Sequence, residues 1–245
     1  MNTFSLSKAL KDGWNLLRAN TGFFVVLSLV TALLQYSHKR HPIVMALQLV
    51  AVLIWSILWK KISLAAAKGK QTQFAFSDIQ QYFPTLKEIL SLIVLSFIVS
   101  GALLVSIGMI KVSVIAAVFG GKSLPTLFIV GVVLFLIGLY IAFRLIFSLY
   151  IFLDQKKSIP ASLMASWHLT MHNLGKTAWT VAATGFINGV GSSVLRGLGL
   201  LITQTPTSYA VAKLYVTLSG TETVTEDIVI QPAEILPPNE EEVLA

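Results

Sequence analysis

Two histidines near the middle of this sequence have a spacing that could do chemistry. His168 and His172 are one helical turn apart, as in zinc proteases that place two imidazoles on one helical face. Such sites also need a general base and a third ligand. Leu, Thr and Met separate the pair, and the other histidines, His38 and His41, belong to a loop expected on the opposite side of a membrane. We interpret the pair as solvated and expect no metal and no cofactor.

Arg144 is the charge that lies most clearly within an apolar stretch, "LYIAFRLIFSLYIFLD". A charged residue in such a segment is a candidate for function by default. Its expected partners are backbone carbonyls, a lipid phosphate, or Asp154, which is ten residues later and on nearly the same face of a continuous helix. Two interpretations stay open: a structural anchor, and a contact for a lipid or a solute.

A polar sequence, "TQTPTS" (203–208), interrupts another apolar stretch and contains Gln204 and Pro206. Helices broken in this way bind solutes in some transporters. A proline can also simply kink a helix, and we favour that interpretation. We nevertheless group Gln204 and Pro206 with Arg144 and Asp154 as candidate lipid or solute contacts.

A stripe of small residues marks one face of the apolar stretch that precedes this sequence. Its members are Gly185, Gly189, Ser193 and Gly197. Small residues spaced four apart let two helix backbones approach each other in lipid. We predict that the stripe packs inside the molecule, with dimerisation as the alternative.

Composition places these residues in a membrane protein. The chain is 55% hydrophobic and 12% charged, with a mean hydropathy of +0.78, whereas soluble domains have about 25% charged residues. A bilayer can cover so much apolar surface, so we predict an all-α, polytopic membrane fold. The absence of cysteine excludes disulfides and thiolate metal sites. No catalytic constellation stands out, and we expect no enzyme.

Six apolar stretches approach the roughly 20 residues that a membrane helix needs. They are 21–36, 42–59, 89–110, 127–152, 177–195 and 197–218. With the N-terminus inside, the inner segments contain eleven Lys and Arg and the outer loops five, and cytoplasmic loops carry such an excess. We therefore expect a multi-pass protein of the bacterial inner membrane with both termini in the cytoplasm.

Charge divides the chain into two parts. Residues 1–220 contain all 18 Lys and Arg and four acids, a balance of +14, whereas residues 221–245 contain seven acids and no base. The basic part suits the anionic lipids of the inner leaflet, and we expect no nucleic acid as a partner. The acidic tail is predicted to be disordered in the cytoplasm. It is a solubilising end or, alternatively, a peptide that binds a protein partner or acts as a secretion signal.

A repeat relates positions 5–22, "SLSKALKDGWNLLRANTG", to positions 158–175, "SIPASLMASWHLTMHNLG". The identical pairs are Ser5/Ser158, Leu10/Leu163, Trp14/Trp167, Leu16/Leu169, Asn20/Asn173 and Gly22/Gly175. A fainter third copy starts at "FSDIQQYFPTLKEIL" (76–90). Each copy precedes a pair of apolar stretches, so we predict three units, each a lead-in helix followed by a membrane hairpin.

The lead-in helices are predicted at about 4–20, 77–88 and 158–173. In the last of them the apolar residues fall within one arc and small or polar residues fill most of the rest. Such a helix lies in the membrane plane, with its apolar face at the acyl boundary and its tryptophan at headgroup depth. Trp14 and Trp167 are therefore the predicted interfacial anchors.

Three segments resemble a family of mostly uncharacterised bacterial inner-membrane proteins. They are "FSLSKALKDGWNLLRANTGF", "FRLIFSLYIFLDQKKSIPASLMASWHLTMHN" and "TPTSYAVAKLYVTL". The family includes the YciC-like proteins and the membrane domain fused to some glycerophosphodiester phosphodiesterases. The resemblance implies a six-span helical fold without an established activity. Lipid hydrolysis is not expected, because no acidic metal-binding cluster is visible.

Two functions are compatible with these features. We favour a non-enzymatic protein that organises the membrane, senses lipid or recruits a partner through its lead-in helices. The alternative is a transporter or channel for a small or lipid-like solute, motivated by Arg144 and the polar sequence around Pro206. A polar cavity joining Arg144 to Gln204 would favour transport, and a closed bundle would favour the first function.

Overall fold

The computed structural model describes residues 4–36, 42–118, 124–194 and 199–220. Within these ranges the chain folds into helices and contains no strand, which confirms the predicted all-α class. The acidic tail, 221–245, lies outside the described residues, as do His38, His41 and Gly197.

The helices follow one another as a series of pairs joined by short segments. They are α1 (Leu6–Ala19), α2 (Thr21–Tyr36), α3 (Pro42–Ala67), the 3₁₀ turn η1 (Phe76–Asp78), α4 (Ile79–Tyr82), α5 (Leu86–Val118), α6 (Leu124–Leu145), α7 (Ser148–Gln155), α8 (Ile159–Met171), α9 (Leu174–Val194) and α10 (Leu200–Ser219).

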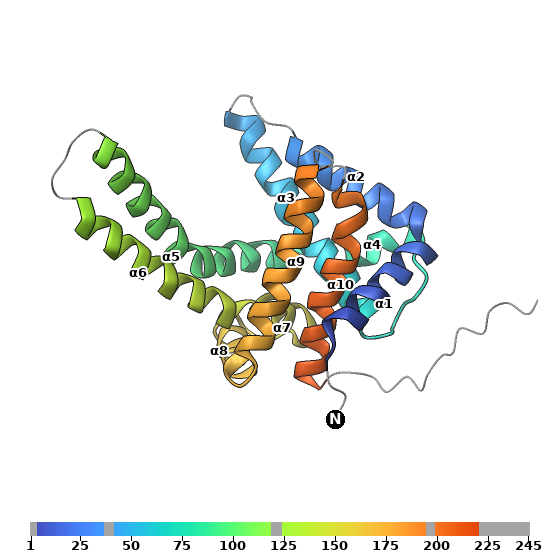
Figure 1. Ribbon diagram of the computed structural model, residues 1–245. Helices are drawn as coiled ribbons and strands as arrows, with labels where there is room; N and C mark the ends of the chain where they lie inside the picture. The colour runs from blue at the N-terminus through green and yellow to red at the C-terminus, as the bar shows by residue number, and fades with distance from the viewer. Residues whose placement is uncertain (1–3, 37–41, 119–123, 195–198, 221–245) are drawn as a thin grey trace, which may run out of the picture.

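Three hairpins extend towards the upper side of the molecule in Figure 1: α2 with α3, α5 with α6, and α9 with α10. The α5–α6 hairpin projects away from the rest of the bundle. Helix α1 packs along α10, and α8 packs against α6 and α7 at the lower side. This arrangement puts the start of α1 and the end of α10 at the same side as α8.

Two helical segments among the described residues are long and apolar enough to cross a membrane, Val50–Ala67 and Phe128–Gln155. A third results if Phe76–Tyr82 and Leu86–Ile98, which meet at 68°, count as one span. Thr21–Thr31 is a shorter apolar helix. Helices α9 and α10 do not reach the same mean hydropathy, because Gly, Ser and Thr are interspersed with their apolar residues. The protein therefore has membrane-spanning helices, and their number, six, stays a prediction.

The lead-in helix predicted at 77–88 is not continuous. η1 and the single turn of α4 end at Tyr82, and α5 begins only at Leu86. Pro84 explains the break, since the residue before a proline is pushed out of the helical region, and Phe83 has φ −59° and ψ 135°. Thr85 and Glu88 then start α5 as a capping box, with Thr85 N–H donating to Glu88 Oε2 at 2.7 Å.

The two stronger copies of the repeat bury the same register positions. α1 buries Ala9, Gly13 and Leu17, and α8 buries Ser162, Ser166 and Thr170, each 153 residues later. The last positions of the repeat also agree. Asn20 Nδ2 donates to the Leu16 carbonyl at 3.1 Å, and Asn173 Nδ2 donates to the Leu169 carbonyl at 3.5 Å.

Aromatic side chains fill the centre of the bundle. Around α2 and α3 the rings of Phe24 and Trp59 stack with centroids 5.9 Å apart. Between α7 and α10, Tyr150 and Tyr215 stack at 5.5 Å, and Phe147 lies beside both. Aromatic pairs of this kind hold helices together beyond the area that they bury.

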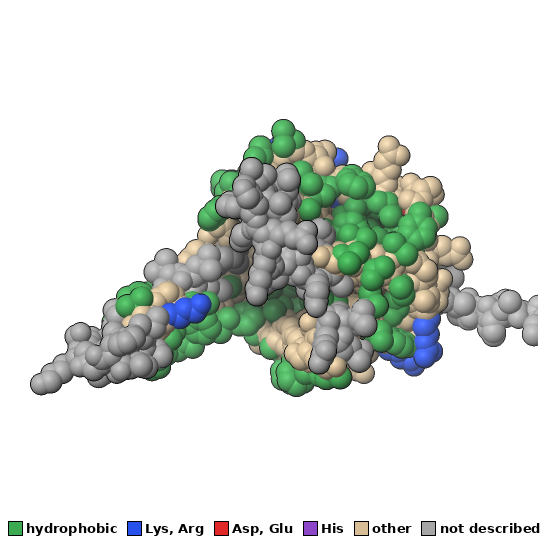
Figure 2. Space-filling view, turned by 90° about the horizontal axis from the view of Figure 1, so that it is seen from above, with side chains coloured by type: hydrophobic (Ala, Val, Ile, Leu, Met, Phe, Trp, Pro, Cys, Tyr) green, Lys and Arg blue, Asp and Glu red, His purple; other side chains and the backbone are tan. Residues whose placement is uncertain are grey.

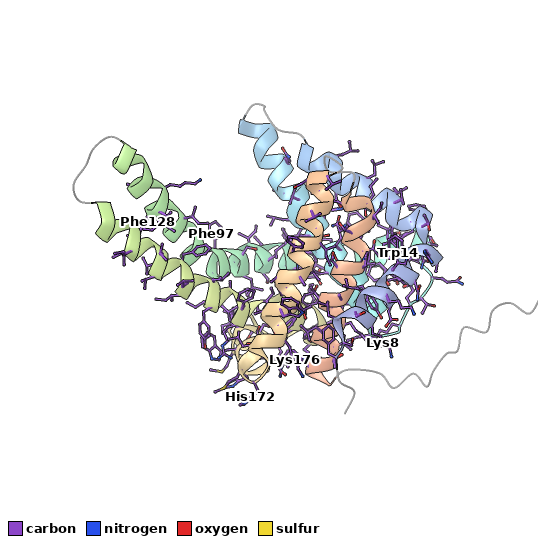
Figure 3. The ribbon with its side chains drawn as sticks, in the orientation of Figure 1. Lys8, Trp14, Phe97, Phe128, His172 and Lys176 are labelled. Atoms are coloured by element: carbon purple, nitrogen blue, oxygen red, sulfur yellow. The ribbon has the colours of Figure 1, made fainter. Side chains whose placement is uncertain are left out.

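The outer surface is apolar to an extent that a soluble protein would not tolerate. Figure 2 shows hydrophobic side chains over much of one face. On the projecting hairpin Phe97 is 72% and Phe128 43% exposed, and both are labelled in Figure 3. Acyl chains would cover these side chains in a bilayer.

Candidate functional site

Arg144 lies in the last turn of α6 and is enclosed by two aromatic rings. Its Nε and Nη2 donate to the hydroxyl of Tyr140 at 2.9 and 2.7 Å. The guanidinium carbon is 5.0 Å from the centroid of the Tyr140 ring and 5.2 Å from that of Trp167. Only 9% of Arg144 is exposed. Cation–π contacts with both rings therefore hold the charge between α6 and α8.

The backbone at Arg144 is equally engaged. Its carbonyl accepts hydrogen bonds from Ser166 Oγ at 2.9 Å and Thr170 Oγ1 at 3.1 Å, both from α8. Carbonyls in the last turn of a helix lack intrahelical partners, and these hydroxyls supply them. Arg144 Nη1 is buried and has no hydrogen-bond partner among the described residues. These contacts favour the anchor interpretation and leave the Nη1 amino group for a further acceptor.

Asp154 does not pair with Arg144, which corrects one of the partners expected from the sequence. Its carboxylate forms an ion pair with Lys68, which directly follows α3, and accepts a hydrogen bond from Tyr215 Oη of α10 at 3.0 Å. A turn at 146–147 separates α6 from α7, so the two residues no longer share one helical face. Asp154 thus links α7 to α10 and to the end of α3, in a cluster that no sequence pattern predicts.

Pro206 lies inside α10, which continues from Leu200 to Ser219 without a break. The broken helix considered from the sequence is therefore absent. Pro206 is buried and faces Gly13 of α1, where a Cβ would lie 2.7 Å from the Pro206 Cα. The absence of a side chain on Gly13 therefore lets α1 approach α10 closely at Pro206.

The small-residue stripe does not pack inside the molecule as predicted. Gly185 and Gly189 are exposed, and a Cβ on either would meet nothing within 4 Å. α9 instead turns Thr177, Thr180 and Thr184 inwards. The buried positions of α9 are thus a threonine row, displaced around the helix from the glycines. Ser193 is exposed too, and dimerisation through this face stays a prediction.

The predicted tryptophan anchors differ in their surroundings. Trp167 is 37% exposed. Trp14 is partly buried, packs against the aromatic core and has the Arg18 guanidinium 5.4 Å from its ring centroid. His168 and His172 are both exposed. No group of three His, Cys, Asp or Glu side chains in the described ranges could hold a metal.

Gln204 lines a pocket of about 220 Å³ between α2, α3, α7 and α10. Its Oε1 is buried and accepts no hydrogen bond from the described residues. Arg144 does not line this pocket, so this cavity does not join Arg144 to Gln204. Lys60 does line it, and this lysine directly follows the apolar stretch predicted at 42–59.

Comparison with known proteins agrees with the membrane setting. Residues 115–231 match the model of a family described as the membrane domain of glycerophosphoryl diester phosphodiesterase. No curated protein and no solved structure matches the chain. The matched range begins near the end of α5 and includes Arg144, Asp154 and Gln204. The match confirms the resemblance found in the sequence and supports a membrane-domain family for this chain.

Proposed function

We propose that this chain is a multi-pass protein of the bacterial inner membrane, with both termini in the cytoplasm. Its proposed role is non-enzymatic: α8 contacts anionic lipid headgroups, by which the protein senses or organises the inner leaflet. The acidic tail is proposed to bind a protein partner. The single observation that supports the lipid role is the way in which α8 distributes its side chains.

The face of α8 that packs on α6 is small and polar, and the face that it exposes is apolar. Ser162 and Ser166 are fully buried. On the other side Met164 is 67%, Met171 52% and Trp167 37% exposed. Water disfavours that distribution, and an acyl boundary favours it.

Exposed cations border this apolar face. Lys156 and Lys157 precede α8, and Lys176 follows it in α9; all three are exposed. Figure 3 places Lys176, His172 and Lys8 of α1 towards the same side of the molecule. A cation beside an anionic leaflet contributes about 1 kcal/mol, so three would favour anionic lipid by roughly 100-fold at most.

The absence of cysteine makes the proposal directly testable, because one introduced cysteine is the only thiol. We would replace Met164 by cysteine (Met164→Cys), attach an environment-sensitive fluorophore, and reconstitute the protein in mixed phosphatidylglycerol–phosphatidylcholine vesicles. Either lipid would carry bromine on its acyl chains as a quencher. We expect brominated phosphatidylglycerol to quench the probe more strongly, and the preference to disappear when the three lysines become glutamine.

A probe at His172→Cys serves as the control, since this position lies at the polar edge of α8 and should stay accessible to aqueous quenchers. Equal quenching by both brominated lipids would contradict headgroup selectivity. A Met164 probe that aqueous iodide quenches freely would contradict the interfacial position itself.

The orientation requires a separate test with impermeant maleimides in intact cells. A cysteine at position 40 should react from outside, and one at position 157 only after permeabilisation. Reaction of position 157 in intact cells would reverse the proposed topology.

A further inference from the structure

The pocket that contains Gln204 is built mainly by one face of α3. Its lining residues at 52, 55, 56, 59, 60 and 63 recur at helical spacing. Tyr150 closes the pocket from α7, and Gln204 and Ser208 close it from α10. No acidic side chain is among the described residues that line it.

Lys60 supplies the charge of this pocket. Two other lysines of the same segment, Lys61 and Lys68, each form an ion pair with a carboxylate. For the partly buried Lys60 the described residues offer only the ring of Tyr150, whose centroid is 6.0 Å from Nζ. That distance is the outer limit of a cation–π contact. The ammonium group therefore faces the pocket without a counter-ion from these parts of the chain.

Some hydrogen-bonding groups around the pocket already have partners within the protein, and others do not. The indole N–H groups of Trp55 and Trp59 are already used, because both donate to Thr31 Oγ1, at 2.7 and 3.1 Å. The buried Gln204 Oε1 has no donor from the described residues. Ser208 adds a hydroxyl to the lining. A complementary ligand would thus present an anion to Lys60 and a donor to Gln204.

We infer that this pocket binds a phosphate-bearing headgroup that also carries a hydroxyl. Lysine binds phosphate as a compact point charge, and the glutamine amide would accept from the hydroxyl. The pocket is smaller than the 300–1,000 Å³ that is usual for whole drug-sized ligands, which suits a headgroup. Val50 and Val52 of α3 are 45% and 38% exposed nearby, so acyl chains attached to that headgroup would lie on apolar surface.

The inference does not rest on the proposed role of α8, since the pocket and the α8 face share no residue. The phosphate can come from a phospholipid or from a soluble phosphate ester. The experiment uses the full-length protein in detergent and measures its thermal unfolding with phosphatidylglycerol, phosphatidylcholine, glycerol 3-phosphate or inorganic phosphate. Native mass spectrometry of the same samples counts bound lipid.

We expect phosphatidylglycerol to stabilise the wild type more than phosphatidylcholine does, and the Lys60→Gln variant to bind it about 10- to 100-fold more weakly. The matched control is Lys70→Gln, which removes the same charge from an exposed position near the end of α3 and should bind normally. Stabilisation by glycerol 3-phosphate that also depends on Lys60 would support the site and identify a soluble source.

Gln204→Leu gives a second test that leaves the net charge unchanged, and Lys60→Arg should retain most of the binding. If Lys60→Gln does not fold, the loss of binding in Gln204→Leu carries the result. Phosphate probes that leave the wild type unchanged would overturn the inference, and so would equal binding by Lys60→Gln and Lys70→Gln. Neither outcome would affect the quenching experiment on α8.

Discussion

Replacing Gly13 by alanine tests the close contact between α1 and α10. The new Cβ would lie 2.7 Å from the Cα of Pro206 and 3.1 Å from the Cβ of Tyr209. Ordinary contact begins at 3.4 Å, so α1 and α10 must separate by about 0.7 Å. Overpacking of this kind costs about 1–3 kcal/mol, and the better helix propensity of alanine returns up to about 1 kcal/mol. We expect a net loss of roughly 1–2 kcal/mol.

Gly189→Ala is the matched control, because it makes the same change within a helix where the Cβ meets nothing within 4 Å. It should raise stability by up to about 1 kcal/mol. The assay is thermal unfolding in detergent, combined with the maleimide labelling rate of a cysteine at Ala9, which is 2% exposed on the buried face of α1. Gly13→Ala should speed labelling. Equal effects of the two substitutions, or unchanged labelling, would refute the close contact.

Three further predictions concern charged side chains. Asp154→Asn removes the carboxylate that pairs with the Lys68 ammonium and should lower the free energy of unfolding by about 3–5 kcal/mol. Replacing Asp154 and Lys68 together by apolar residues should recover most of that stability, as measured by thermal unfolding. Arg144→Leu should release α8 from α6, so that a cysteine at the fully buried Ser162 is labelled faster. The labelling rate in Arg144→Lys should be intermediate, because lysine cannot reproduce the planar stacking of the guanidinium. Lys60→Met should stabilise the protein in lipid-free detergent by about 1 kcal/mol of unfolding free energy, because it removes a partly buried cation that lacks a counter-ion. The melting temperature should therefore rise. A lowered melting temperature would mean that the fold stabilises the charge.

Local sequence patterns predict the helices of this protein well because their causes are local. The apolar stretches at 21–36 and 177–195 correspond to helices with bounds of Thr21–Tyr36 and Leu174–Val194. The break in the second lead-in helix could also be predicted from the sequence, since Pro84 lies within it. Treating 77–88 as one helix gave amphipathic periodicity more weight than the conformational restriction before proline.

The contacts of the charged residues could not be predicted from local sequence patterns, because they join distant parts of the chain. Lys68 and Asp154 are separated by 86 positions, and no periodicity relates them. Lys60 and Lys61 show the difficulty most clearly. The two adjacent lysines differ by about 100° around α3, so that Lys61 reaches Glu88 at 2.8 Å while Lys60 faces the pocket. Only the packing of the neighbouring helices distinguishes a structural ion pair from a ligand-binding cation.

The position of the lead-in segments indicates how the three units close into one bundle. α8, which begins the third unit, packs on α6, the membrane helix that ends the second. The short α4 of the second unit lies against α3, which ends the first. By the same rule α1 should pack on the last helix of the third unit, and it does pack on α10. The N-terminal helix thus completes a cyclic arrangement, and the Gly13–Pro206 contact is the point at which the two ends of the described chain meet.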